Sequence, residues 1–387
     1  MDPRTHHYES EYPDEVSTRQ AGSGARYQPR HGLSIPSITI LDSDGRVIEE
    51  QQRRVFRHNV QQGLGADIIF GGGTTGEWNR ITNIERQRLI WIEADEIARL
   101  NREIKAAGQQ PIEAWVGITS ETRAETLMNL ECALDAGVDA VVVAPLSIHD
   151  LGDIVTFFQR EVNDLFDHRG GWLPVFLYDN AEIAVDPRAS HIRTRSLKRL
   201  SRLPFISGVK VSASRRVLGN YTKGALHFKD KGEFGIYIGN AMLMFQTFRL
   251  DDGLVGRVRE YWNRYLLHNE LPIGVVAGPA NVMPREWQRA WRACYAGDDR
   301  LMPVYKAAFD QFNAACNFGD SGRSVEKMTA SLKYALKLDS VIESDLVAAG
   351  TPELTEDERR EFAVRYSKIK KELSTATNPI WITRPQR

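Results

Sequence analysis

The sequence contains little cysteine and no histidine cluster of the kind that binds metals. Its 387 residues include three cysteines, Cys132, Cys294 and Cys316, which stand far apart and form no CxxC pair. An odd number at this spacing argues against a disulfide scaffold, and a reducing cytoplasm is the default location. The pair His6-His7 lies in a polar terminal segment and the other histidines show no ligand spacing, so we expect no metal site.

The chain also lacks an excess of charge of either sign and a long hydrophobic run. Lys plus Arg number 50 and Asp plus Glu 51, which gives a net charge of -1 with neutral histidine. Chains that coat nucleic acid or an anionic membrane need a basic excess, so we expect neither partner. No apolar run approaches the roughly 18 residues of a membrane helix, and residues 1–7 lack the order of a signal peptide.

The pattern of the sequence changes near residue 31. Residues 1–30 are polar, mixed in charge and without apolar period, which predicts a flexible N-terminal arm. From Leu33 onward, short apolar runs alternate with longer segments of helical period. A hydrophobic content of 42% is enough for a sizeable core, so this part of the chain is predicted to fold.

The apolar runs predict strands and the segments between them predict helices. Most runs are near-continuous Val, Ile or Phe, which is typical of strands buried on both faces. The runs are residues 37–41, 67–71, 112–118, 140–144, 174–178, 205–211, 234–238 and 272–277. Helices are predicted over 84–100 and over 120–134, the second starting at Thr119-Ser120 and stopping at Gly137.

About eight strand-and-helix repeats over roughly 250 residues predict an α/β protein, a (β/α)₈ TIM barrel at 31–284. A doubly wound open sheet is the alternative, but the chain has no GxGxxG after the first strand and no GxxxxGK[ST]. One insertion, residues 253–271, follows a helix and precedes a strand. We expect it on the N-terminal face of the barrel, where it serves assembly or stability more than catalysis.

After the last strand the pattern is helical only. This predicts a C-terminal helical domain and tail at 285–387, with the Trp287 to Trp291 stretch as helix packing. The helices are predicted over 285–296, 301–316, 324–338 and 355–373. The last opens with a capping box, in which Thr355 and Glu358 satisfy each other's backbone N–H groups.

Catalytic groups of such a barrel sit at the C-terminal ends of its strands. The second run ends in the sequence GGGTTGE, Gly71 to Glu77, whose amides and hydroxyls suit a carboxylate or phosphate. A plain glycine-rich turn with a threonine cap is the alternative, and Glu77 is read as the start of a helix. The fifth run ends at Tyr178-Asp179-Asn180, where the tyrosine is either a proton donor or a rim aromatic.

Lys210 is the sharpest chemical signal, because it lies within the apolar sixth run. Burying an ammonium is expensive, and desolvation lowers the pKa of a lysine. With an ordinary pKa of about 10.4, about one amine in 2,500 is neutral at pH 7, and lowering the pKa to roughly 7 relieves about 4.6 kcal/mol. A neutral amine forms a Schiff base with a ketone. The alternative is a lysine that snorkels from the strand end to solvent.

Together these motifs resemble the dihydrodipicolinate synthase / N-acetylneuraminate lyase family. The match in order and spacing covers GTTGE, Tyr178-Asp179-Asn180, Gly208 to Ser212 (GVKVS) and Gly278 to Asn281 (GPAN), within about Leu33 to Leu373. The resemblance implies a Schiff base between Lys210 and pyruvate or another 2-oxo acid. It also implies no metal or organic cofactor, and a homo-oligomer, a dimer or tetramer.

The resemblance assigns further residues. Tyr178 would shuttle the proton with Thr74 as hydroxyl relay. Thr75, Gly76 and the neighbouring amides would hold the substrate carboxylate. The remaining substrate-binding positions would be Ser212, Gly239 and Asn281.

Three departures from the family pattern point to a paralogue with another substrate. The family's fourth strand often ends Pro-Tyr-Tyr, lending a tyrosine to the neighbouring subunit, whereas this chain reads Pro145 to Ile148 (PLSI). The synthase places an arginine shortly after its Tyr-Asn, whereas residues Ala181 to Ala184 (AEIA) contain none. Asp179 also interrupts the Tyr-Asn pair, which bears on the local geometry.

Three functions stay open from the sequence. The first is a Schiff-base lyase or aldolase that makes or breaks a carbon–carbon bond. The second keeps Lys210 but eliminates water from a 2-keto-3-deoxy sugar acid. The third is a barrel without catalysis that has a binding role. The aldehyde or sugar-acid substrate is not defined by the sequence.

Overall fold

The structure is a computed structural model of the chain. It describes residues 27–224, 234–248, 272–319 and 325–377, and every structural statement below concerns these residues. Most of the predicted arm and the whole predicted insertion at 253–271 lie outside them.

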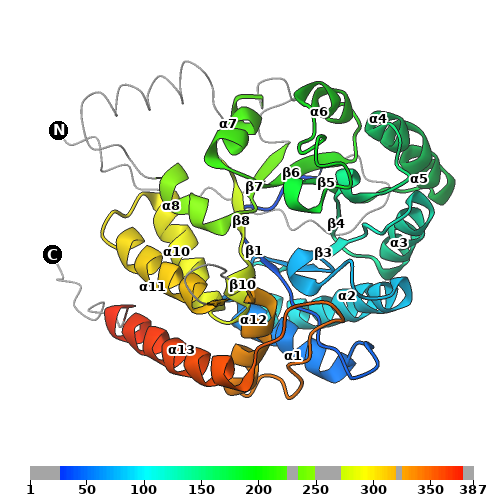
Figure 1. Cartoon of the computed structure of the whole chain (residues 1–387). Coiled ribbons are helices and arrows are strands. Elements are labelled where there is room, and N and C mark those ends of the chain that lie inside the picture. Colours follow the sequence, from blue (N-terminus) through cyan, green and yellow to red (C-terminus); the bar gives the residue numbers. More distant parts are fainter. Residues whose placement is uncertain (1–26, 225–233, 249–271, 320–324, 378–387) are drawn as a thin grey trace, which may run out of the picture.

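Eight parallel strands close into a barrel in sequence order, which confirms the predicted TIM-barrel fold (Figure 1). The strands are β1 Gly32–Pro36, β2 Ile68–Gly71, β3 Glu113–Gly117, β4 Ala140–Val143, β5 Val175–Asn180, β6 Ile206–Ser212, β7 Gly235–Ile238 and β8 Gly274–Val276. Inward-facing residues of adjacent strands are paired in register. Tyr178 of β5 is the register partner of Lys210 of β6, which is in turn the partner of Tyr237 of β7.

The predicted position of the first strand was wrong. β1 is Gly32–Pro36, and residues 37–41 follow it as a buried loop segment. Ile38 and Ile40 are fully buried, so the run is apolar, but their backbone N–H groups bond to side chains of Asn281 and Gln52. Side chains therefore replace the neighbouring strand as hydrogen-bond partners of this buried segment. Hydrophobicity alone does not distinguish a buried loop of this kind from a buried strand.

Helices cover the outside of the barrel. They include α1 Glu49–Val60, α2 Asn83–Ala106, α3 Arg123–Ala136, α5 Asn163–Arg169, α6 Thr194–Leu200, α7 Arg215–Gly224 and α8 Met244–Thr247, with the short α4 Ile154–Thr156. The N-terminus of α3 is capped by Thr122, not by the predicted Thr119-Ser120, because the Thr122 hydroxyl accepts from the N–H of Glu125 at 3.2 Å. Its predicted stop is confirmed, with Gly137 left-handed at φ 68°.

The C-terminal helices group on one side of the barrel, next to α1 (Figure 1). They are α10 Pro284–Ala296, α11 Met302–Ala315, α12 Met328–Leu338 and α13 Glu356–Thr377. The predicted helix at 324–338 starts later, because β10 Val325–Glu326 pairs with β9 Asn317–Phe318. The capping box of α13 is confirmed, with Thr355 N–H to Glu358 at 2.7 Å and Glu358 N–H to Thr355 at 3.3 Å.

The core is continuous between the barrel and these helices. The main cluster of buried apolar residues contains members from both, and Trp287 of α10 stacks on Phe309 of α11 with ring centroids 3.9 Å apart. This stacking agrees with the packing role predicted for the Trp287 to Trp291 stretch. The predicted domain boundary near residue 284 stays a prediction.

Aromatic rings fill the N-terminal half of the barrel interior. Trp115 of β3 stacks on Phe176 of β5 at 3.9 Å, and Tyr237 of β7 packs edge-on against both. Tyr27 contacts Phe176 and donates a hydrogen bond to Glu113 at 2.7 Å. These rings thus pack together as a floor across the barrel interior, and the catalytic groups of such barrels lie at the C-terminal strand ends.

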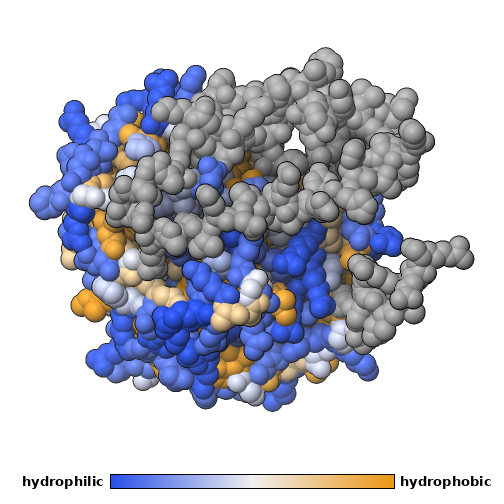
Figure 2. Space-filling model, turned by 180° about the vertical axis from the view of Figure 1, so that it is seen from behind, coloured by the Kyte–Doolittle hydropathy of each residue, from blue (hydrophilic) through white to orange (hydrophobic). Residues whose placement is uncertain are grey.

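The outer surface is that of a mixed, mostly hydrophilic protein. Figure 2 shows the side opposite to Figure 1, where hydrophilic residues predominate and apolar residues are scattered among them. Among the described residues, no helix combines the length and apolar character that crossing a membrane requires.

Candidate active site

Lys210 occupies the inner face of β6 and is 4% exposed. Its ammonium nitrogen lies 3.8 Å from the ring centroid of Tyr178 and 5.0 Å from that of Phe70. Burial lowers the pKa of Lys210, and the nearby phenol of Tyr178 acts in the opposite direction with smaller effect. The lysine is therefore enclosed by the barrel, as its apolar strand predicted, and does not snorkel to solvent.

The phenol of Tyr178 is the centre of a hydroxyl cluster at the strand ends. Its oxygen lies 3.5 Å from Thr74 Oγ1 and 3.2 Å from Ser212 Oγ, and it accepts a 3.0 Å bond from Asn180. Burial alone would raise the pKa of Tyr178, but the adjacent Lys210 charge and these hydrogen bonds hold it below its ordinary value. A proton can therefore move among three hydroxyls beside the amine.

The glycine-rich loop after β2 forms a 3₁₀ turn, η2 Thr74–Gly76. Gly72 has φ 66°, a left-handed conformation that suits glycine. On the far side, Gly278 after β8 approaches the turn closely, since a Cβ there would lie 3.2 Å from Thr75 Oγ1. The turn is thus held between β2 and the loop after β8, with Thr74 toward Tyr178 and Thr75 toward Gly278.

Gly239 and Asn281 have different surroundings. A Cβ at Gly239 would lie 2.2 Å from Ser212 Oγ, so only glycine lets the loop after β7 pass the hydroxyl cluster. Asn281 is fully buried, and both its amide hydrogens go to backbone oxygens, of Pro36 and Gly278, at 2.8 Å. Any contact of Asn281 with a substrate would be indirect.

Glu77 does not open a helix, and that prediction was wrong. It follows the 3₁₀ turn in a left-handed conformation, φ 59°, and its carboxylate is buried. The carboxylate accepts from Lys333 Nζ at 2.5 Å, from Ala348 N–H at 2.7 Å and from the Thr351 hydroxyl at 2.6 Å. Sequence analysis missed Lys333; the available signal was a lysine in an apolar stretch of a predicted helix.

Asp179 leaves the geometry of Tyr178 intact. Successive side chains of a strand point to opposite faces, so Asp179 points out of the barrel. There its carboxylate contacts His191 Nδ1 at 3.2 Å and accepts from the Tyr221 hydroxyl at 2.5 Å. Burial raises the pKa of Asp179, while Tyr221 and His191 counteract this. Asn180, which sequence reasoning did not select, points inward and reaches Tyr178.

The two positions that depart from the family pattern lie near the barrel mouth. Ile183 packs against the cluster of inward-facing residues that contains Tyr178. Ser147, in the 3₁₀ turn η3 Pro145–Ser147, is buried, and its hydroxyl has no partner within the described chain. Arg215 and Arg216 are exposed on the first turn of α7.

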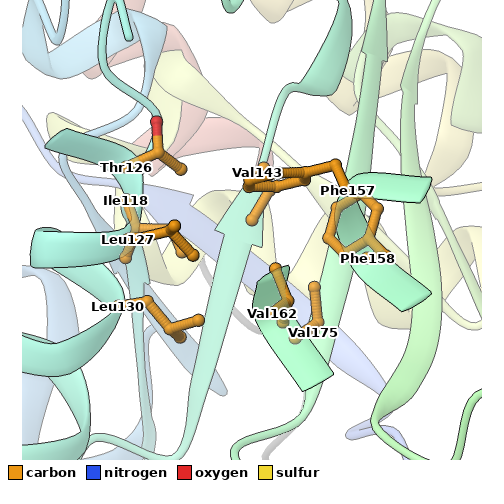
Figure 3. Close-up of a pocket in the computed structure, with 9 residues that line it drawn as sticks. All are labelled: Ile118, Thr126, Leu127, Leu130, Val143, Phe157, Phe158, Val162 and Val175. Atoms are coloured by element: carbon orange, nitrogen blue, oxygen red, sulfur yellow. The ribbon is translucent and has the colours of Figure 1, made fainter. Parts of the chain in front are cut away.

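The described residues offer no metal centre, and the pocket in Figure 3 lies apart from this site. Among the described residues, no group of three or more His, Cys, Asp or Glu side chains converges to hold a metal ion. A small pocket between α3, β4, β5 and the helical segment Phe157–Val162 is lined almost wholly by apolar side chains, with Thr126 as its polar member (Figure 3). It contains none of the candidate site residues, and we interpret it as a packing defect.

The described residues form a closed (β/α)₈ barrel with a lysine and a tyrosine in its interior and a GTTG turn next to them. These features together define a class of barrel proteins. The sequence matches the dihydrodipicolinate synthetase family over residues 30–256, and the chain belongs to this family.

Solved structures agree with the fold. A dihydrodipicolinate synthase from Bacteroides thetaiotaomicron has a TM-score of 0.66 at 22% identity, covering 88% of this chain and 99% of that one. A sialic acid aldolase from Ruminococcus gnavus has a TM-score of 0.67 at 14% identity, covering 89% of this chain and 98% of that one. At these identities the likeness concerns the fold.

The relatives found by sequence match a smaller part of this chain than the solved structures do. A DapA-like lyase from Halobacterium salinarum is 27% identical over 184 residues, 47% of this chain and 53% of the relative. An N-acetylneuraminate lyase from Clostridium perfringens is 27% identical over 136 residues, 35% of this chain and 43% of the relative. The chain thus spans about half the length of the curated relatives it matches.

Proposed function

We propose that this protein is a lyase or aldolase that forms a Schiff base between Lys210 and pyruvate or a related 2-oxo acid. The observation that carries the proposal is the buried amine of Lys210 beside the hydrogen-bonded phenol of Tyr178. Membership in a family whose named relatives include lyases supports it. No metal or organic cofactor enters the proposed reaction.

In the cleavage direction, the neutral amine adds to the C2 carbonyl of the substrate, and loss of one water, with a proton from the Tyr178 phenol, gives a protonated imine and the Tyr178 phenolate. The phenolate then takes the proton of the C4 hydroxyl. The C3–C4 bond breaks, an aldehyde leaves, and the bonding electrons move into the iminium to form an enamine. The Tyr178 phenol protonates C3, and hydrolysis of the resulting iminium by one water returns pyruvate and the free amine and gives a proton back to the phenolate.

Thr74 and Ser212 support this proton transfer. Both hydroxyls lie within hydrogen-bond reach of the Tyr178 oxygen, so either can relay a proton between that oxygen and the C4 hydroxyl or C3 of the substrate. Thr75, Gly76 and the amides of the turn would hold the substrate carboxylate near the ammonium. Gly239 would leave room beside Ser212, and Asn281 would fix the loop after β8 behind the site.

We also propose a homo-oligomer, a dimer or tetramer. Large apolar side chains are exposed on neighbouring helices, with Ile84 and Trp91 on α2 at 76% and 49% and Met128 on α3 at 54%. A second copy of the chain would remove such side chains from water.

Borohydride trapping tests the proposal. The protein is mixed with pyruvate and a panel of 2-keto-3-deoxy sugar acids, reduced, digested and analysed by mass spectrometry. We expect a reduced adduct on the peptide that contains Lys210, and none in Lys210→Ala or Lys210→Arg, because arginine keeps the charge but forms no imine.

Both variants should also lose turnover with the fold intact, as checked by circular dichroism. Turnover by either variant would contradict the proposal. Absence of any adduct in the native protein would favour a binding barrel. Product analysis separates an aldolase, which releases pyruvate and an aldehyde, from a dehydratase, which releases a dehydrated acid.

A further inference from the structure

We infer that the buried ion pair between Glu77 and Lys333 is a positioning device by which the C-terminal helices hold the carboxylate-binding turn in its binding geometry. The inference rests on the proposed function and assigns Lys333, on α12, a role in substrate binding at a turn 256 residues earlier in the chain.

The first observation is the conformation of Glu77. A non-glycine residue with φ near 60° is strained, and such a conformation persists where its surroundings impose it. Glu77 has φ 59° and ψ 35°, and its N–H closes the turn onto the Thr74 carbonyl at 3.1 Å. Rotation of Glu77 out of this conformation would therefore displace the carbonyl of Thr74 and the amides that follow it.

The second observation is what imposes that conformation. Every donor to the Glu77 carboxylate, Lys333, Ala348 and Thr351, belongs to α12 or the segment after it. Lys333 is itself fixed by a 2.7 Å bond to the Leu346 carbonyl. Arg80, just after the turn, also donates to the Thr351 hydroxyl at 2.9 Å.

The third observation is burial. The Lys333 side chain is 0% exposed and the Glu77 side chain 3%, so water cannot replace either partner. Removing one member of a buried pair leaves the other charge without compensation, and the surrounding backbone moves to find new partners. Because the turn lies next to Glu77 in sequence, a movement of the Glu77 backbone also moves the turn.

If the ion pair between Glu77 and Lys333 only stabilised the fold, its removal would have a different effect. Removal would lower the stability of the fold without changing the geometry of the turn in those molecules that are folded. Positioning predicts instead a change in substrate affinity per folded site, with the chemistry at Lys210 left nearly as fast at saturation.

Four proteins separate the two cases: the native chain, Glu77→Gln, Lys333→Met and the double variant. Each is trapped with borohydride over a range of pyruvate concentrations, and the thermal midpoint is recorded. We expect the half-saturating pyruvate concentration to rise about tenfold or more in Glu77→Gln and in the double variant, with the limiting trapping rate within about threefold of native. A tenfold change corresponds to about 1.4 kcal/mol.

The double variant keeps the test decisive if a single variant folds poorly, because it leaves no buried charge unpaired. Glu358→Gln is the matched control. It removes an ion pair with Lys327 inside the C-terminal helices, 2.6 Å long, that does not touch the turn. Its half-saturating concentration should equal that of the native protein.

A second measurement needs no ligand. Amide hydrogen exchange of the peptide over residues 73–78 should accelerate about tenfold or more in Glu77→Gln and the double variant, and stay native in Glu358→Gln. Unchanged exchange and unchanged half-saturation with a lowered thermal midpoint would overturn the inference. If the native protein forms no imine, the proposed function fails, while the exchange result still decides whether the pair holds the turn.

Discussion

At the scale of single residues, the proposed chemistry depends on the aromatic rings next to Lys210. The described contacts of its nitrogen are the faces of Tyr178 and Phe70, which stabilise a cation less than a carboxylate does. Burial therefore lowers the pKa of Lys210, and more of the amine is neutral at physiological pH than in a solvated lysine.

This lowered pKa predicts a pH dependence for imine formation. Only the neutral amine adds to a ketone, so the trapping rate at limiting pyruvate should rise with pH and level off above the pKa of Lys210. We expect a midpoint clearly below the ordinary lysine value of about 10.4. A rate that still rises beyond that value would show a solvated, ordinary lysine.

Glu93, on α2, offers a second prediction at this scale. It is fully buried, and neither carboxylate oxygen has a hydrogen-bond partner of ordinary geometry in the described chain. Burial raises its pKa well above the ordinary value. The folded state thus holds a proton that the unfolded chain releases above pH about 4.3, so its stabilising effect is lost as pH rises through the folded pKa.

We therefore expect Glu93→Gln to be more stable than the native protein at pH 8 and to differ little from it near pH 4. The gain at pH 8 is about 1.4 kcal/mol for each pKa unit by which folding raises the pKa of Glu93. Urea unfolding at the two pH values measures it. An equal difference at both would show that the carboxyl group does not titrate in this way.

At the scale of elements, the strand ends bring the site together through close backbone approaches. The loop after β7 passes Ser212 at Gly239, and the loop after β8 passes Thr75 at Gly278. At Gly239 a Cβ would lie 2.2 Å from Ser212 Oγ, which leaves no room for a side chain, whereas at Gly278 it would lie 3.2 Å from Thr75 Oγ1, a tight contact. These two loops and the turn after β2 surround one hydroxyl cluster.

Gly239→Ala should therefore damage the site. The added Cβ would lie 2.2 Å from Ser212 Oγ and 2.8 Å from the Ser212 nitrogen, so backbone must move. We expect turnover to fall about tenfold or more, with a loss of stability of about 1–3 kcal/mol. Gly219→Ala on α7 is the control: nothing lies within 4 Å of its Cβ, and it should be neutral or slightly stabilising.

Much of the element order could be predicted from the sequence, because buried parallel strands have a distinctive composition. Seven of the eight predicted strands overlap the observed ones. The error at residues 37–41 arose because side chains, and not a neighbouring strand, form hydrogen bonds with the backbone of that buried segment. The same limit applies to the site. Lys210 stood out through its apolar neighbours. Lys333 also lies in an apolar stretch, but its bond to Glu77 joins residues far apart in the chain, and Asn180 reaches the Tyr178 oxygen from two residues along the same strand.

At the scale of the whole molecule, the barrel mouth would restrict the second substrate of the proposed reaction. By the sequence resemblance, residues Ala181 to Ala184 stand where a dihydrodipicolinate synthase places its arginine, and Ile183 among them packs on the interior cluster with Tyr178. Arg215 and Arg216 are exposed on α7. An electrophile that carries its own carboxylate thus lacks a buried cation at that position.

We expect pyruvate and aspartate semialdehyde to be condensed poorly. A charged hydrogen bond contributes roughly 1.5–3 kcal/mol, so its loss lowers kcat/KM by about ten- to a hundredfold. The measurement follows the cyclic product, with a neutral aldehyde acceptor for comparison. Turnover of the semialdehyde as fast as that of the neutral acceptor would show that another residue supplies the cation.

The aromatic floor of the barrel has a consequence for the order of events. Trp115, Phe176 and Tyr237 pack together across the barrel interior, so in the proposed reaction the substrate would enter and the products would leave at the C-terminal strand ends. In the proposed reaction the fragment bonded to Lys210 would lie deepest, with the aldehyde fragment between it and the strand ends. The aldehyde would then depart before pyruvate, so the first carbon atoms of the substrate to enter would be the last to leave.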